Sequence, residues 1–250
     1  MREQPEQQAP PVQRLRIRYA KRGRLRFTSH RDFSRAFERA IARARVPMAF
    51  SSGFNPHPRI SYAGASPTGA ASEAEYVEIG LAQVCDPQAV ARELDASLPD
   101  GLDILDVVVS SGGSLSERLE GSHWEITLTG VGAEELAAAV EQLLAAPEVM
   151  VERMTKKGLR TFDARAAIVS LQVRPGGESQ AGDRTCAILQ VVLRHGTPSV
   201  RPDDVLAALR EISETGVQPA ALAQRLAQGP LDPQTGTVGD PLAPDRDAAG

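Results

Sequence analysis

The order of hydrophobic periodicities along residues 13–110 most constrains how this chain can fold. Apolar and basic residues alternate over 14–19, which is typical of a strand with one buried face. Between Ser29 and Pro47, apolar residues recur at the i, i+3, i+4 spacing of an amphipathic helix. The rest of this region predicts, in order, strands over 60–63 and 75–81, a helix over 87–98 and a strand over 102–109.

This β-α-β-β-α-β order predicts a ferredoxin-like module, in which two helices cover one face of an antiparallel sheet. Residues 115–228 partly repeat the order, with a further helix expected over 219–227. We therefore predict an α+β chain with a ferredoxin-like module over 13–110 and a degenerate ferredoxin-like repeat over 115–228. Residues 1–12, rich in Gln and Pro, and residues 229–250, rich in Gly, Pro and Asp, are predicted to be disordered.

The charge is distributed unevenly along the sequence. Residues 1–60 carry 14 Lys or Arg and 4 acidic residues, a net charge of +10, which leaves 14 basic and 28 acidic residues for the remainder, a net charge of −14. A basic end on an acidic body indicates either a polyanionic partner or docking between the two halves.

Cysteine usage and hydropathy exclude several classes of protein. Cys85 and Cys186 lie about a hundred residues apart, so neither a disulfide framework nor a cysteine-held metal or iron–sulfur cluster is expected. No segment approaches the roughly 20 apolar residues that span a bilayer, and the first residues lack the apolar centre of a signal peptide. We expect a cytoplasmic protein without cofactor or metal.

Three segments carry a family resemblance. Leu25–Asp32 (LRFTSHRD), Gly53–Ser61 (GFNPHPRIS) and Glu73–Ile79 (EAEYVEI) resemble the successive motifs of the radical-SAM-linked family of domains of unknown function, and residues 156–158 and 163–165 extend the match. The resemblance implies a separate radical-SAM protein as partner, because a radical-SAM core needs three closely spaced cysteines and this chain has two cysteines far apart.

Arginines dominate the candidate binding residues. The guanidinium group binds phosphate through paired donors, so we expect RNA contacts from the strand and helix arginines of the first module: Arg16, Arg18, Arg24, Arg26, Arg31, Arg35 and Arg39. Lys156 and Lys157 form a second basic cluster, which would either clamp a phosphate backbone or lie in a solvated loop. The alternatives for the arginines are a solvated face, an acidic protein partner, or the acidic second half of the chain.

A proline-rich loop and a helix start supply the other candidates. Pro56 and Pro58 stiffen the loop that holds Asn55, His57 and Arg59, so these side chains are expected to be presented to a ligand, or else to satisfy local backbone groups.

His30 stands at the start of the first helix, where anions are favoured; the alternative is an exposed histidine beside the capping residues. Glu73, Glu75 and Glu78 are expected to pair with the arginines more readily than to hold a metal.

Three functions follow as hypotheses. The first is an accessory module that binds RNA, or presents a substrate, and works with a separate radical-SAM protein. The second is a metal-independent ribonuclease of tandem ferredoxin-like type, with His30 and His57 as its base and acid. The third is an assembly partner of a radical-SAM enzyme that makes no RNA contact.

Overall fold

The computed structural model describes residues 7–155, 158–176, 186–213 and 216–248. The chain divides into two compact units: residues 1–118 with residues 241–250, and residues 119–240. The second unit is therefore an insertion, in sequence, between the body of the first unit and its last segment. None of the helices in the described ranges has the length and apolar character needed to cross a membrane.

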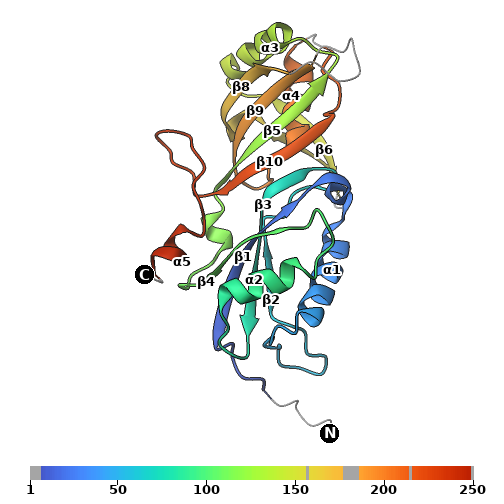
Figure 1. The fold of residues 1–250 in the computed structure, drawn as a ribbon. Coiled ribbons are helices and arrows are strands. Elements are labelled where there is room, and N and C mark those ends of the chain that lie inside the picture. Colours follow the sequence, from blue (N-terminus) through green and yellow to red (C-terminus); the bar gives the residue numbers. More distant parts are fainter. Residues whose placement is uncertain (1–6, 156–157, 177–185, 214–215, 249–250) are drawn as a thin grey trace. The chain divides into compact units, whose positions relative to one another are not determined.

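The first unit is an antiparallel sheet with the strand order β4-β1-β3-β2. Its elements are β1 (Gln13–Lys21), a 3-10 turn (Gly23–Phe27), α1 (His30–Arg43), β2 (Ile60–Ala63), β3 (Ala71–Leu81), α2 (Pro87–Asp95), β4 (Ile104–Val109), a second 3-10 turn (Ser116–Arg118) and α5 (Ala243–Asp247). This is the predicted ferredoxin-like order and confirms an α+β fold (Figure 1).

Both long helices of the first unit pack on the same face of its sheet. The core joins side chains of β1 such as Leu15 and Ile17 to Phe37 of α1 and Leu94 of α2. Because side chains alternate along a strand, Arg14, Arg16 and Arg18 lie on the other face, which neither α1 nor α2 covers. We call this the open face.

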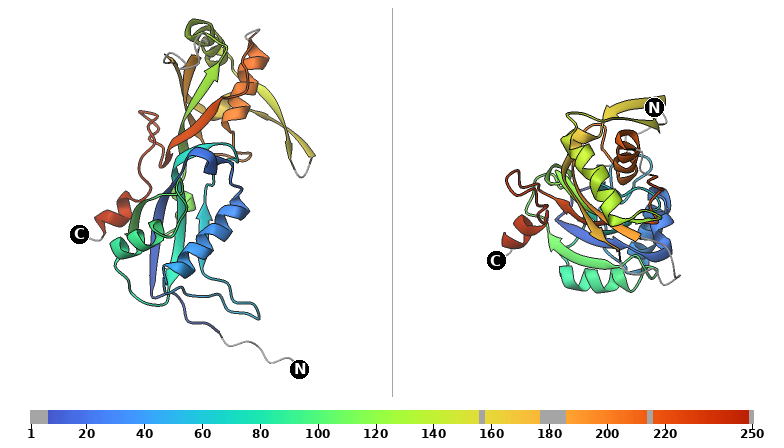
Figure 2. Two further views of the ribbon diagram at one scale, coloured as in Figure 1. Left: turned by 45° about the vertical axis from the view of Figure 1, so that its right-hand side comes forward. Right: turned by 90° about the horizontal axis from the view of Figure 1, so that it is seen from above.

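The second unit repeats the topology of the first. Its elements are β5 (Gly121–Thr129), α3 (Ala133–Ala145), the hairpin β6 (Met150–Thr155) and β7 (Gly158–Asp163), a 3-10 turn (Arg165–Ala167), β8 (Ile168–Pro175), β9 (Cys186–Arg194), α4 (Pro202–Ile212) and β10 (Leu222–Gly229). Within this unit the strand order is β10-β5-β9-β8. If the sheet strands of each unit are numbered along the chain, both sheets have the order 4-1-3-2. The second unit differs in having the hairpin β6–β7 inserted after its first helix (Figure 2).

The helix predicted over 219–227 is wrong. Residues 222–229 form β10, which pairs with β5 in antiparallel register. Ala, Leu, Gln and Arg favour helix locally, but the pairing with β5 supplies the fourth strand of the sheet and overrides that preference.

The two segments expected to be disordered contain ordered parts. Gln8 donates its backbone N–H to Ser52 Oγ at 2.9 Å, and Val12 donates to the carbonyl of Leu81 at 2.9 Å. At the other end, Gly239 donates to the carbonyl of Pro230 at 2.8 Å, and α5 buries Asp245 in the first unit. Gln8, Val12 and Asp245 are held by hydrogen bonds to distant segments, and Gly239 by a bond within its own segment.

Candidate nucleic-acid interface

The arginines of α1 form a free basic ridge. Phe33, Phe37, Ala40 and Ile41 are the buried residues of the helix. Arg31, Arg35 and Arg39 recur every four residues on the opposite side and are exposed. Among the residues that the structure describes, none accepts a hydrogen bond from their side chains or forms an ion pair with them. We call these three residues the α1 ridge; Arg43 extends it but donates to the carbonyl of Ser97.

The expected role of Arg16 as an RNA contact is wrong, because its side chain is fully buried. Its Nε donates to Glu78 at 2.9 Å and its Nη1 donates to both carboxylate oxygens of Asp245 at 2.8 and 2.9 Å. Its Nη2 donates to the carbonyls of Gly112 and Gly113 at 2.9 and 2.7 Å. All three nitrogens are therefore used inside the first unit.

The carboxylate of Asp245 accepts hydrogen bonds from several donors on the open face. Burial acts to raise the pKa of its carboxyl, but hydrogen bonds from Ser111, Arg16 and Arg118 outweigh it and hold the pKa at about 2. Ser111 donates through both its backbone N–H and its hydroxyl, at 2.9 and 2.7 Å, and Arg118 Nη1 donates at 2.7 Å. The carboxylate thus stays ionised and fixes the end of the chain to β1.

The remaining arginines of the expected site are spread over several environments. Arg18 is half-buried and donates from Nε to the carbonyl of Glu73 at 2.8 Å. Arg24 is exposed, and Arg26 lies over the ring of Phe27, 4.5 Å from its centroid. These three arginines therefore differ in exposure and in their contacts.

The proline-rich loop is the tip of a hairpin formed by residues 49–59. Arg59 donates its backbone N–H to the carbonyl of Ala49, and Ser51 donates to that of His57, each at 2.8 Å. The turn exposes Phe54 (70%) together with Asn55 and His57. Asn55 and His57 are thus exposed beside an aromatic ring, whereas Arg59 donates from Nε to the carbonyl of Phe50 at 3.1 Å.

The two histidines of the ribonuclease hypothesis lie in different settings. The His30 ring packs edge-on against Tyr62, with 4.8 Å between ring centroids. His57 is exposed in the turn of the hairpin.

Two of the three glutamates of β3 pair with arginines, as expected, whereas Glu75 is buried and has a backbone partner. Glu73 pairs with Arg22 and Glu78 with Arg16, while Glu75, which is buried, accepts from the backbone of Ser66 at 3.1 Å. In the described ranges no group of three or more His, Cys, Asp or Glu side chains has the placement of a metal site.

The second unit holds one polar chain that the sequence did not reveal. Trp124 Nε1 donates to Ser122 Oγ at 2.8 Å, and Ser122 Oγ lies 3.0 Å from His195 Nε2. His195 Nδ1 lies 2.7 Å from the carbonyl of Leu119, which can only accept, so Nδ1 carries a proton. Burial lowers the pKa of His195, which keeps the ring neutral. Lys156 and Lys157 lie outside the described residues.

Comparisons with known proteins give a family. No curated protein matches the sequence. Among solved structures, the chain is similar to DtpA from Streptomyces lividans in its oxyferrous complex (10% identity, 94% of this chain and 95% of that chain, TM-score 0.22). It is also similar to DyPB from Rhodococcus jostii RHA1 (11% identity, 86% and 91%, TM-score 0.21). Scores this low carry no argument. A family model matches residues 14–202, and the chain therefore belongs to the family described as "Uncharacterized protein conserved in bacteria (DUF2344)".

Proposed function

We propose that this protein is an accessory RNA-binding protein that works with a separate radical-SAM protein. The observation that carries the RNA contact is the α1 ridge: three exposed guanidinium groups on one helix face, without partners in the described part of the chain. Unpaired arginines at a spacing of one helical turn suit successive phosphates of a nucleic acid, and release of counterions from the phosphates drives the association.

The hairpin tip supplies the second kind of contact. Phe54 is a bare aromatic ring on which an unpaired base stacks, and Asn55 and His57 beside it offer polar groups to a base edge. The open face is a poorer platform than the sheet of an RNA-binding ferredoxin-like domain. Its central Arg16 is buried, and Tyr76 on the adjacent strand is also buried.

The radical-SAM partnership rests on the motifs in residues 25–32, 53–61 and 73–79. The hairpin tip comes from the second of these motifs, and His30 and Arg31 at the start of the α1 ridge come from the first. The proposed RNA contacts and the motifs that imply the partner therefore fall on the same part of the chain.

The test is binding of fluorescently labelled single-stranded RNA across a salt series. We compare the unaltered protein with Arg31→Ala/Arg35→Ala/Arg39→Ala and with a control that loses the same charge from exposed arginines elsewhere, Arg92→Ala/Arg160→Ala/Arg194→Ala. Loss of three phosphate contacts lowers the slope of log affinity against log salt by about 2 for a single strand. Equal effects of the two triple variants, or no binding at low salt, would overturn the RNA-binding proposal.

The partnership needs its own experiment. Tagged protein is isolated from cells with and without nuclease treatment, and the retained proteins are identified by mass spectrometry. A protein with the three-cysteine radical-SAM motif is expected. If the radical-SAM protein is still retained after nuclease treatment, and the tagged protein binds no RNA, the assembly role is favoured instead.

A further inference from the structure

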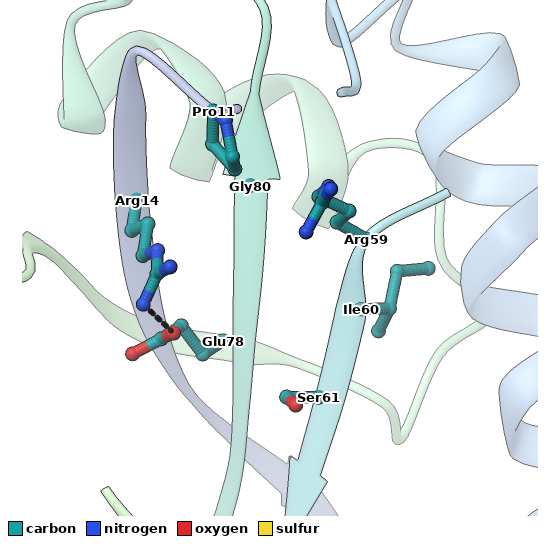
Figure 3. A pocket seen from close by; sticks show the side chains of 7 residues that line it. All are labelled: Pro11, Arg14, Arg59, Ile60, Ser61, Glu78 and Gly80. Atoms are coloured by element: carbon teal, nitrogen blue, oxygen red, sulfur yellow. Dashed lines mark ion pairs between the residues drawn. The ribbon is translucent and has the colours of Figure 1, made fainter. Parts of the chain in front are cut away.

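A groove crosses the open face of the first unit between β1 and β2. It encloses about 260 Å³ and is lined by Pro11, Arg14, Arg59, Ile60, Ser61, Glu78 and Gly80 (Figure 3). All of these residues belong to the first unit.

Strand pairing sets Arg14 and Arg59 on either side of a glycine. Arg14 is the register partner of Gly80 in β1–β3, and Gly80 donates its N–H to the carbonyl of Arg59 at 2.9 Å. Adjacent strands are about 4.8 Å apart, so the two arginines start roughly 10 Å apart in one cross-strand row. Two guanidinium groups at that separation can converge on a single phosphate.

Gly80 lets the ring of Pro11 pack directly on β3 between the two arginines (Figure 3). A Cβ built there would lie 2.8 Å from Pro11 Cγ and 3.2 Å from Arg59 Cβ. A glycine inside a strand is a signal for close approach of a ligand or another chain segment. Backbone and the ring of Pro11 therefore form the base on which a ligand would rest.

Most N–H donors of the two arginines have no hydrogen-bond acceptor among the described residues. Arg59 uses Nε to donate to the carbonyl of Phe50 at 3.1 Å, which fixes the plane of its guanidinium group. In the described ranges its two Nη atoms have no acceptor, and Figure 3 shows the side chain reaching from the residue before β2 toward Gly80. Arg14 Nη1 forms an ion pair with Glu78 Oε1 at 3.7 Å, a separation too long for a hydrogen bond (Figure 3).

A second hollow adjoins the groove beside Glu78. Glu78 Oε2 accepts from Arg16 at 2.9 Å, while Oε1 accepts no hydrogen bond from the described residues. Arg14, Ser61 and Glu78 also line an adjoining hollow of about 470 Å³, whose wall further includes Tyr62, Ala63, Gly113, Ser114, Leu115 and Ser116. A ligand held at the arginines would thus extend past the carboxylate of Glu78 into a hollow whose wall offers the hydroxyl groups of serines beside the apolar groups of Ala63 and Leu115.

We propose that this groove binds a nucleoside monophosphate, with the phosphate between Arg14 and Arg59. Glu78 Oε1 accepts from a ribose hydroxyl, and the base lies in the adjoining hollow. The site is separate from the α1 ridge, which stands on a helix packed against the other face of the sheet. The nucleotide is either free or the 5′-terminal nucleotide of an RNA; both present the same phosphate and sugar.

Calorimetric titration of the full chain with AMP, adenosine and inorganic phosphate tests the site. AMP should bind, and inorganic phosphate and adenosine should bind at least about tenfold more weakly, since each lacks one half of the contacts. Arg59→Gln and Arg14→Gln should each weaken AMP binding at least about tenfold, whereas Arg92→Gln, at an exposed arginine of α2, should leave it unchanged. Thermal unfolding of each variant checks that it folds.

Absence of AMP binding at millimolar concentration, or AMP binding that Arg59→Gln does not weaken in a folded variant, would overturn the proposal. A short RNA with and without a 5′ phosphate separates the two sources. Preference for the phosphorylated end that is lost in Arg59→Gln identifies an RNA end, and AMP binding without that preference identifies a free nucleotide. Because Arg35 lies outside the groove, loss of RNA affinity in the ridge variant with AMP binding intact distinguishes the two sites.

Discussion

Arg16 and Asp245 form a buried ion pair between residues separated by 229 positions in the sequence. Both side chains have zero solvent exposure. A buried pair of this kind is costly to break, because removing one partner leaves an uncompensated charge inside the protein. The pair therefore makes the last segment of the chain part of the first unit.

Asp245→Ala should destabilise the first unit by about 3 kcal/mol. The substitution leaves the guanidinium groups of Arg16 and Arg118 without their shared acceptor. Urea unfolding monitored by hydrogen exchange in β1 measures the change. Asp247→Ala is the matched control, since Asp247 is exposed two residues away; equal effects of the two substitutions would contradict the role given to the pair.

The carboxylate of Asp245 should also make the free energy of unfolding depend on pH in the acidic range. Its pKa falls from 3.8 to about 2 on folding, so the unfolded state binds the proton more readily. Its stabilisation, about 2 kcal/mol, is complete above pH 4 and is lost as the pH falls toward 2. Unfolding free energies measured between pH 5 and 2 should fall more steeply for the unaltered protein than for Asp245→Asn. Parallel curves would show that another group is responsible.

The pairing of Asp245 with Arg16 is not predictable from the sequence. The alternation over 14–19 predicted β1 and placed its arginines on the face opposite the core, which the structure confirms. Periodicity says which face a side chain lies on, but not what covers that face. Burial of Arg16 depends on a segment rich in Pro, Gly and Asp whose composition is that of a disordered tail, and which is anchored by Asp245 and by the ion pair of Arg246 with Asp106.

The groove is not predictable from the sequence, for a related reason. Arg59 was predicted as a binding residue, but Arg14 and Gly80 become its neighbours only through the register of β1 with β3. Register between distant strands is not encoded in local pattern. The one local signal is a glycine near the end of the strand predicted over 75–81.

Gly80→Ala should lower stability by about 1–3 kcal/mol, as expected for overpacking. The added methyl would meet Pro11 Cγ at 2.8 Å and Arg59 Cβ at 3.2 Å. Chemical unfolding measures the cost. Gly196→Ala is the control, because a Cβ there has nothing within 4 Å, and its effect should stay within about 0.5 kcal/mol.

The second unit should lose stability as the pH falls below 6.5. Burial lowers the pKa of both His195 and His123 on folding, so the unfolded state takes up protons first. Stability is complete above pH 6.5 and declines by up to about 1.4 kcal/mol per pH unit for each histidine until its folded pKa is passed. His195→Gln should remove one of the two contributions, and unfolding curves from pH 8 to 5 would reveal it. A slope unchanged in His195→Gln would contradict this assignment.

Phe54→Ala should weaken RNA binding without changing its salt dependence. Base stacking on an aromatic ring is worth about 1–3 kcal/mol and releases no counterions. The α1 ridge substitutions should instead lower the salt slope. Salt series on Phe54→Ala, on the ridge variant and on Val84→Ala, which removes an equally exposed apolar side chain, separate the two contributions. If Phe54→Ala lowered the salt slope, or if Val84→Ala weakened binding as much, the hairpin tip would not be a stacking surface and the RNA would have to be held by the arginines alone.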